Sequence, residues 1–249
     1  MQDVLNIASY RFVAIADVDA VAVRVKDSCE RHALKGTVLV SPEGINIFLA
    51  GSDGGIRGFL AELQADSRFD GITVKFSRSG FVPFKRLRVK RKREIITYRD
   101  ASLQPEKGRA PSVSPETLAR WLDRGCDDAG REVVLLDTRN VEEVVYGSFE
   151  GALTFPIAKF TELPDAVASR KEDLAGKTVV SFCTGGIRCE KSVLRMQAEG
   201  YPDCYQLEGG ILGYFEKMGG KHYQGRCFVF DDRIALDPNL DPLIETPGF

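Results

Sequence analysis

The alternation of apolar and polar residues predicts two successive folding patterns along this chain. In the first pattern, we expect a strand at 4–16, a helix from Asp17 to about Leu34, strands at 37–40 and 45–50, a helix at 55–65 and a strand at 72–77. This order, β-α-β-β-α-β, is that of a ferredoxin-like fold. Residues 1–100 are therefore predicted to form a ferredoxin/acylphosphatase-like α+β domain.

From Val113 onward, short apolar runs alternate with helical patterns. We expect helices from Pro115 to about Arg124, at 141–146, at 158–174 with a break at Pro164, at 189–199 and at 211–218, and strands at 133–137, 149–153, 179–182 and 204–207. Such alternation is typical of a parallel sheet with helices on both faces. Residues 113–220 are therefore predicted to be an α/β domain.

Two further segments complete the predicted organisation. Residues 101–112 contain Pro, Gly and Ser without an apolar period, and we interpret them as a linker. Residues 221–249 contain a short apolar run, and we expect them to form a tail that packs on the domains.

Composition adds limits on location and cofactors. An apolar content of 43% and a charged content of 28% are those of a globular protein. No apolar run is long enough to cross a membrane, and the N-terminus lacks a secretion pattern. The six cysteines include no Cys-x2-Cys pair, so we expect reduced thiols in the cytoplasm and no zinc or other metal site. No flavin, iron or nicotinamide motif is visible, so no cofactor is expected.

The strongest chemical signal is a cysteine placed where a strand meets a helix. Cys183 follows the apolar run 179–182, and a short loop with two glycines leads into the next helix. Backbone N–H groups in such a loop, and the charge of Arg188, would stabilise a thiolate and lower its pKa. We predict that Cys183 is a nucleophile, the alternative being a small buried core residue.

Other residues of this region support the prediction that Cys183 is a nucleophile. The active loop is completed by Thr184, Gly185, Gly186 and Ile187. Cys189 directly follows Arg188, and either resolves an oxidised Cys183 as a disulfide or packs in the first helical turn. Asp137 and Arg139 follow a buried strand and should lie at the same sheet edge as Cys183, where we expect them to brace the loop.

A basic segment distinguishes the N-terminal half, which has a net charge of +6 over residues 1–111 against −8 over 112–249. Its seven basic residues are Lys85, Arg86, Arg88, Lys90, Arg91, Lys92 and Arg93. The flanking aromatic residues Phe81, Phe84 and Tyr98 could stack on unpaired bases, so the segment predicts RNA binding. The alternative is a solvated strand with one charged face, since Leu87 and Val89 alternate with the basic residues.

The spacing Cys-x4-Arg resembles the active loop of the rhodanese (sulfurtransferase) superfamily, whereas phosphatases of the Cys-x5-Arg type have a longer loop. The fuller motif Cys183-Thr-Gly-Gly-Ile-Arg-Cys-Glu-Lys191 is similar to the rhodanese-domain tRNA uridine hydroxylases. Glu43-Gly-Ile-Asn46 and Gly225-Arg-Cys-Phe-Val-Phe-Asp231 agree with that family. The resemblance implies a rhodanese-like second domain and oxygen-dependent formation of 5-hydroxyuridine at the wobble position in the tRNA anticodon loop.

Two alternatives remain open from the sequence. A plain sulfurtransferase would carry a persulfide on Cys183 and would not need the basic segment. An RNA-binding module with an inactive rhodanese domain would not need the reactive cysteine and arginine together.

Overall fold

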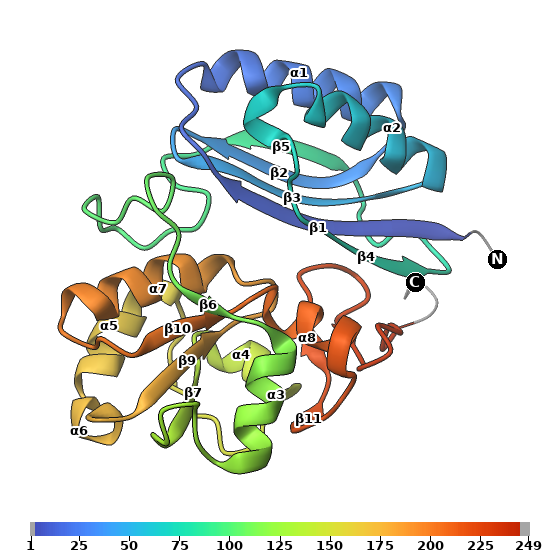
Figure 1. Cartoon of the computed structure of the whole chain (residues 1–249). Helices are drawn as coiled ribbons and strands as arrows, with labels where there is room; N and C mark the ends of the chain where they lie inside the picture. Colours follow the sequence, from blue (N-terminus) through green and yellow to red (C-terminus); the bar gives the residue numbers. More distant parts are fainter. Residues whose placement is uncertain (1–2, 245–249) are drawn as a thin grey trace. The chain divides into compact units, whose positions relative to one another are not determined.

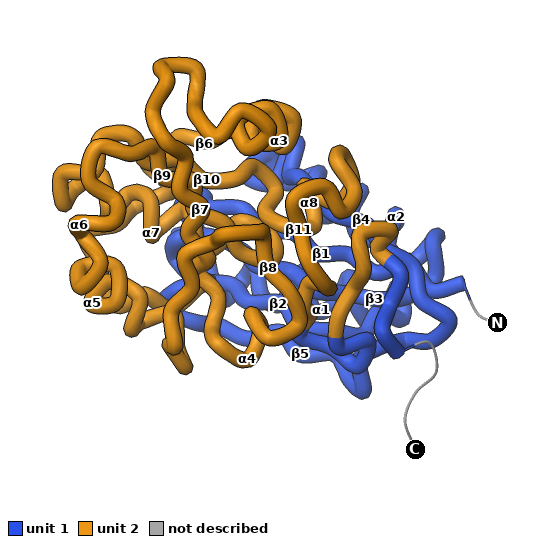
Figure 2. Tube along the Cα trace, turned by 90° about the horizontal axis from the view of Figure 1, so that it is seen from below, with its two compact units in different colours: residues 1–95, 230–234, 241–249 blue, residues 96–229, 235–240 orange. Residues whose placement is uncertain are grey.

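The computed structural model describes residues 3–244, and these form two compact units (Figure 2). The first unit takes residues 3–95, 230–234 and 241–244 of the described chain, and the second takes 96–229 and 235–240. None of the helices in this described range is long and apolar enough to cross a membrane.

The first unit contains a five-stranded sheet with two helices on one face (Figure 1). The strands are β1 (Val4–Phe12), β2 (Lys35–Ser41), β3 (Gly44–Gly51), β4 (Val74–Ser79) and β5 (Leu87–Arg91), in the sheet order β4-β1-β3-β2-β5. The helical elements are α1 (Val18–Arg31), α2 (Asp53–Gln64) and a short 3-10 turn η1 (Ser67–Phe69). The predicted β-α-β-β-α-β order is confirmed.

The core of this unit follows from the two-residue period of its strands. Val38 and Val40 of β2 and Ile47 of β3 are fully buried and pack on the apolar faces of α1 and α2. β5 runs parallel to β2 and adds Leu87 and Val89 to the same face. The sheet is therefore mixed, not purely antiparallel.

The second unit is built on a parallel sheet of order β6-β10-β9-β7 (Figure 1). Its strands are β6 (Ser112–Val113), β7 (Val133–Asp137), β9 (Thr178–Phe182) and β10 (Cys204–Leu207). The helical elements are α3 (Pro115–Arg124), α4 (Val141–Val144), η2 (Phe160–Glu162), α5 (Leu163–Ala168), α6 (Lys171–Leu174), α7 (Ile187–Ala198) and α8 (Gly210–Met218). Short pairs are formed by β8 (Gly147–Phe149) with β11 (Tyr223–Gly225), and by β12 (Cys227–Phe228) with β13 (Ala235–Leu236).

Both faces of this parallel sheet are covered, as predicted. Val180 points into a cluster with α3 and α8, while its neighbour Val179 points into a second cluster with α5 and α7. The alternation is that of a strand buried on both sides. The strands end at one edge, which carries Asp137 and Cys183.

Several predicted boundaries differ from the structure. Pro164 does not break a helix, because it lies in the first turn of α5, where a missing N–H costs nothing; the break falls between α5 and α6. The strand expected at 149–153 is β8, ending at Phe149, with Leu153 forming only an isolated bridge to Leu136.

The segment interpreted as a linker and the predicted C-terminal tail both belong to the compact units. Residues 101–112, interpreted as a linker, belong to the second unit, where Leu103 and Ala110 are buried in its core. The C-terminal segment alternates between units, since residues 230–234 belong to the first and 235–240 to the second. Because the apolar residues of segment 101–112 follow no period, the sequence did not indicate that they are buried.

Candidate active site

Cys183 lies directly after β9, at the start of the loop that leads into α7. Its side chain is only 2% exposed. The backbone N–H of Gly186 donates a hydrogen bond to its Sγ at 3.1 Å, and the backbone N–H of Arg188 also donates to it. The predicted cradle of loop N–H groups is therefore present around the sulfur.

The pKa of Cys183 reflects competing effects. Burial, the largest of them, raises the pKa; the hydrogen bond from Cys189, the charge of Arg188 and the backbone N–H groups lower it to about 6. The pKa of Cys189 is raised well above the ordinary value by burial and by the neighbouring sulfur. Near neutral pH, Cys183 is thus the thiolate of the pair and Cys189 the thiol that donates to it.

The loop itself is held by α8. The N–H of Ile211 donates to the carbonyl of Cys183 at 2.9 Å, and that of Leu212 donates to the carbonyl of Thr184 at 3.1 Å. A Cβ on Gly210 would lie 2.5 Å from the Cys183 carbonyl oxygen, so the close approach requires glycine there. The N-terminus of α8 therefore fixes the backbone of the loop.

The residues of the active loop differ in their solvent exposure. Thr184 and Gly185 are partly exposed, whereas Gly186, Ile187 and Arg188 are buried. Gly186 has φ +100° and is the N-cap of α7, so the helix begins at Ile187 and not near Cys189 as predicted. Thr184 and Gly185 are therefore the residues of the loop that solvent reaches.

Arg188 is paired, which the sequence did not indicate. Its guanidinium meets the carboxylate of Glu143 in α4 at 2.7 and 2.8 Å, and both side chains are nearly or fully buried. Nη1 of Arg188 also donates to the carbonyl of Thr138 at 3.4 Å. Glu143 is thus a site residue that motif reasoning missed; its only signal was its place three residues after Asn140, typical of a helix cap.

Asp137 and Arg139 form a second buried ion pair, with Nη2 of Arg139 2.6 Å from Oδ2 of Asp137. The same Nη2 donates to the carbonyl of Gly147 at 2.7 Å, and Ser148 donates to Asp137 at 2.8 Å. These contacts tie the end of β7 to β8. The pair lies at the sheet edge as expected, and the segment that it directly braces is β8.

The motif at 225–231 explains a further part of the site. Gly147 and Gly225 face each other, and a Cβ on Gly225 would lie 2.4 Å from the carbonyl oxygen of Tyr146. This close approach places β12 beside the active loop, where the hydroxyl of Thr184 donates to the carbonyl of Phe228 at 3.3 Å. Burial raises the pKa of the adjacent Cys227 to about 12, so it is a neutral thiol.

The side chains of the motif at 43–46 form hydrogen bonds with the backbone of the first unit. The N–H of Ile95 donates to Glu43 at 2.7 Å, and the side chain of Asn46 donates to the Ile95 carbonyl at 3.3 Å. The motif therefore holds Ile95 at both its N–H and its carbonyl.

The basic segment is an exposed edge strand and its continuation. All seven basic side chains are exposed, and Arg91 forms an ion pair with Asp19 of α1. The predicted aromatic partners differ, since Phe81 and Tyr98 are buried and only Phe84 is partly exposed. Base stacking by Phe81 and Tyr98 is therefore excluded in this conformation.

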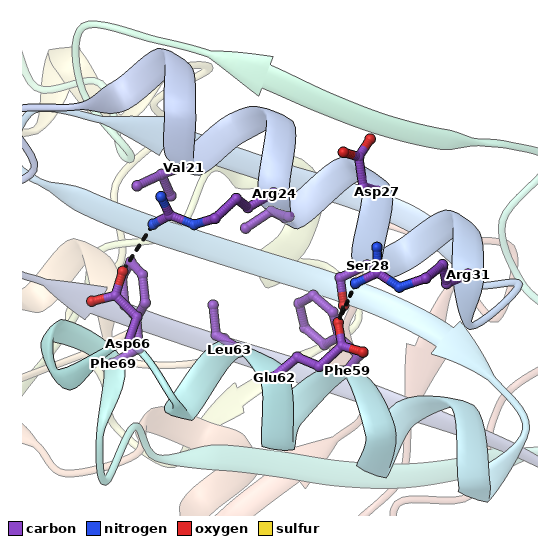
Figure 3. Close-up of a pocket in the computed structure, with 11 residues that line it drawn as sticks. Val21, Arg24, Asp27, Ser28, Arg31, Phe59, Glu62, Leu63, Asp66 and Phe69 are labelled. Atoms are coloured by element: carbon purple, nitrogen blue, oxygen red, sulfur yellow. Dashed lines mark hydrogen bonds and ion pairs between the residues drawn. The ribbon is translucent and has the colours of Figure 1, made fainter.

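A separate hollow of about 210 Å³ lies between α1 and α2 (Figure 3). Its arginines are paired, Arg24 with Asp66 and Arg31 with Glu62. No predicted site residue lines it. Among residues 3–244, no group of three or more His, Cys, Asp or Glu side chains is placed to hold a metal ion.

A cysteine cradled by N–H groups at the carboxyl edge of a parallel sheet defines the second unit as a rhodanese-like domain. Residues 114–217 match the rhodanese-like domain family, and residues 4–95 match the family described as UPF0176 acylphosphatase like domain. Over nearly its full length, the chain belongs to the tRNA uridine(34) hydroxylase family.

Two relatives illustrate this family membership. The tRNA uridine(34) hydroxylase of Xanthomonas euvesicatoria pv. vesicatoria is 57% identical over 242 residues, covering 97% of this chain and 98% of that protein. The protein of the same name from Cupriavidus taiwanensis is 56% identical over 239 residues, covering 96% and 85%. The solution structure of a rhodanese-like domain from Anabaena aligns with a TM-score of 0.38 at 19% identity, covering 46% of this chain and 79% of that one.

Proposed function

We propose that this protein hydroxylates uridine 34 of tRNA at carbon 5, forming 5-hydroxyuridine in the anticodon loop, with molecular oxygen as co-substrate. The observation that carries the proposal is the coincidence of two facts. Relatives named tRNA uridine(34) hydroxylase match almost the whole chain, and the loop shared with rhodaneses holds a thiol whose pKa is lowered to about 6. The reaction belongs to the cytoplasm, where tRNA is modified.

Cys183 is the reacting group in this proposal. Its thiolate adds to carbon 6 of uracil, which opens the C5–C6 double bond and leaves an electron pair at C5. C5 takes one oxygen atom, and loss of the C5 proton then expels the thiolate and restores the double bond. The other oxygen atom of dioxygen leaves as water, which requires two electrons and two protons. An external dithiol reductant supplies both as it is oxidised to its disulfide.

The burial of Cys183 agrees with an unpaired base as substrate. At 2% exposure, the sulfur is out of reach of a base stacked inside a duplex. A base in a loop is already unpaired, so its extrusion toward Thr184 and Gly185 costs less.

The basic segment supplies RNA binding in this proposal. In the described part of the chain, the side chains of Arg88 and Lys90 are exposed and have no acidic partner within ion-pairing distance. On alternate positions of β5 they point away from Leu87 and Val89, hence away from the helices. Cations placed in this way release counterions when they meet phosphates.

A matched pair of variants tests that role. Arg88→Gln/Lys90→Gln is expected to weaken tRNA binding and to reduce the slope of log affinity against log salt by about 1 to 2. Lys26→Gln/Arg57→Gln removes two exposed charges from α1 and α2 and should leave the slope unchanged. Equal slopes for the two variants would assign β5 a structural role only.

The hydroxylation itself is tested with purified protein, tRNA from cells that lack the gene, and isotopically labelled dioxygen. The expected product is 5-hydroxyuridine at position 34 carrying one labelled oxygen, with none formed by Cys183→Ala. Full activity of Cys183→Ala would eliminate the covalent role. A persulfide on Cys183 that is passed to an acceptor, without hydroxylation, would favour the sulfurtransferase.

A further inference from the structure

Glu143 is a buried carboxylate whose role in the active loop has not been assigned. It is 0% exposed, and its two oxygens lie 2.7 and 2.8 Å from the two terminal nitrogens of Arg188. Paired contacts of this kind fix the direction of a planar guanidinium and offset its charge. Glu143 therefore reduces the field of Arg188 at Cys183, although the charge of Arg188 still lowers the pKa of that thiol.

The local sequence explains why the carboxylate stays in place. Glu143 is in the first turn of α4, and its Oε2 also accepts the backbone N–H of Asn140 at 3.0 Å. The carboxylate is thus anchored at a helix start independently of Arg188. Nη1 of Arg188, which contacts Glu143, also donates to the Thr138 carbonyl at 3.4 Å.

Within residues 3–244, several charged or titratable groups act on Cys183, Arg188 or Cys227. They include Arg188 and Cys189 on α7, Glu143 on α4, Asp137 and Arg139 at the end of β7, and Cys227 on β12. The opposite charges cancel within each ion pair, Arg188 with Glu143 and Arg139 with Asp137. The pKa values of Cys189 and Cys227 are raised, so these two cysteines are neutral thiols. The net charge of these groups is that of the Cys183 thiolate, one negative charge.

We propose that Glu143 is a positioning residue that offsets the charge of Arg188, so that the loop holds one thiolate and admits an uncharged base in preference to an anion. The preference for a base rests on the proposed function, since uracil is neutral at pH 7 whereas phosphate and thiosulfate are anions. Without Glu143, Arg188 presents its full charge to any anion approaching the loop.

The test compares two alkylating reagents on Cys183, neutral iodoacetamide and anionic iodoacetate. Both form a carbon–sulfur bond and release iodide, so the ratio of their rate constants reports the charge near the sulfur and cancels effects of access. In Glu143→Gln, the iodoacetate/iodoacetamide ratio is expected to rise about tenfold, and the pKa of Cys183 to fall by about one unit.

Glu142→Gln is the matched control, because Glu142 is the exposed neighbour on the same helix. It removes the same charge without a contact to Arg188, and the ratio should stay at the wild-type value. An unchanged ratio in Glu143→Gln, or an equal rise in Glu142→Gln, overturns the proposal.

A second comparison is available if Glu143→Gln does not fold. Arg188→Gln should lower the ratio about tenfold, whereas Glu143→Gln/Arg188→Gln, which removes the pair as a unit, should return it near the wild-type value. Equal ratios in these two variants also overturn the proposal. None of these measurements uses hydroxylation, so a wild-type protein that shows the charge effect but forms no 5-hydroxyuridine refutes the function alone.

Discussion

The hydrogen bond from Cys189 to the Cys183 sulfur can be removed by Cys189→Ala. It is the first of the effects that lower the pKa of Cys183, after burial has raised it. A hydrogen bond to a charged group contributes about 1.5–3 kcal/mol, or roughly 1–2 pKa units. The pKa of Cys183 should therefore rise from about 6 to about 7–8, and its thiolate fraction at pH 7 should fall from about 90% to about 10–50%.

The assay is a pH titration of the ultraviolet absorbance of the thiolate, taken as the difference from Cys183→Ser. Cys204→Ala is the matched control. Cys204 is also buried, but its thiol contacts Met196, which lies about two turns beyond Cys189 along α7. An unchanged titration in Cys189→Ala would contradict the donor role and make Cys189 a packed residue. If Cys189 is also the resolving thiol, the variant should lose oxidant-induced disulfide formation.

Three further outcomes follow from the site. Folding lowers the pKa of Cys183 from 9.0 to about 6. The contribution of this thiolate to the free energy of unfolding is therefore absent below pH 6, grows between pH 6 and pH 9, and is complete above pH 9. Urea unfolding of Cys183→Ser, measured across this pH range, should lack the rise. Asp137→Asn leaves the buried Arg139 without its counter-ion and should lower the free energy of unfolding by about 3–5 kcal/mol. Gly225→Ala, with φ +84° and a Cβ 2.4 Å from the Tyr146 carbonyl oxygen, should lower it by about 1–3 kcal/mol, and an unchanged melting temperature would contradict the close approach.

The elements that were predicted best have their own local signals. α3 runs from Pro115 to Arg124 as expected, since Ser114 accepts from the Thr117 N–H and Gly125 adopts φ +73° at the C-cap. β7 also matches, because a continuous apolar run is typical of a strand buried on both faces. Where helix-capping residues and the apolar pattern agree, the local sequence is sufficient to predict the element.

Other elements depend on contacts distant in sequence. β5 carries the alternation of a strand, but its parallel pairing with β2 depends on a neighbour about fifty residues earlier. Segment 101–112 has no period, and its place is set by Glu190 of α7, which accepts from the N–H of Ala110 at 3.2 Å. Local patterns contain neither kind of information.

The same distinction applies to the site. Cys183 and its loop were predicted because glycines and Arg188 follow directly in the sequence. Glu143 was missed because a capping glutamate on the surface and a buried counter-ion look alike in sequence. The stacking role expected for Phe81 and Tyr98 was wrong, because an aromatic residue beside a basic run gives no sign of which side chain is buried.

The most direct test of the function is nucleoside mass spectrometry of bulk tRNA from cells with the gene deleted, in a strain with no second route to 5-hydroxyuridine. We predict that 5-hydroxyuridine and its derivatives disappear, that wild-type protein restores them, and that Cys183→Ala does not. If 5-hydroxyuridine persists at the wild-type level after deletion, or if Cys183→Ala restores it, the account of a cysteine-dependent tRNA uridine hydroxylase is contradicted.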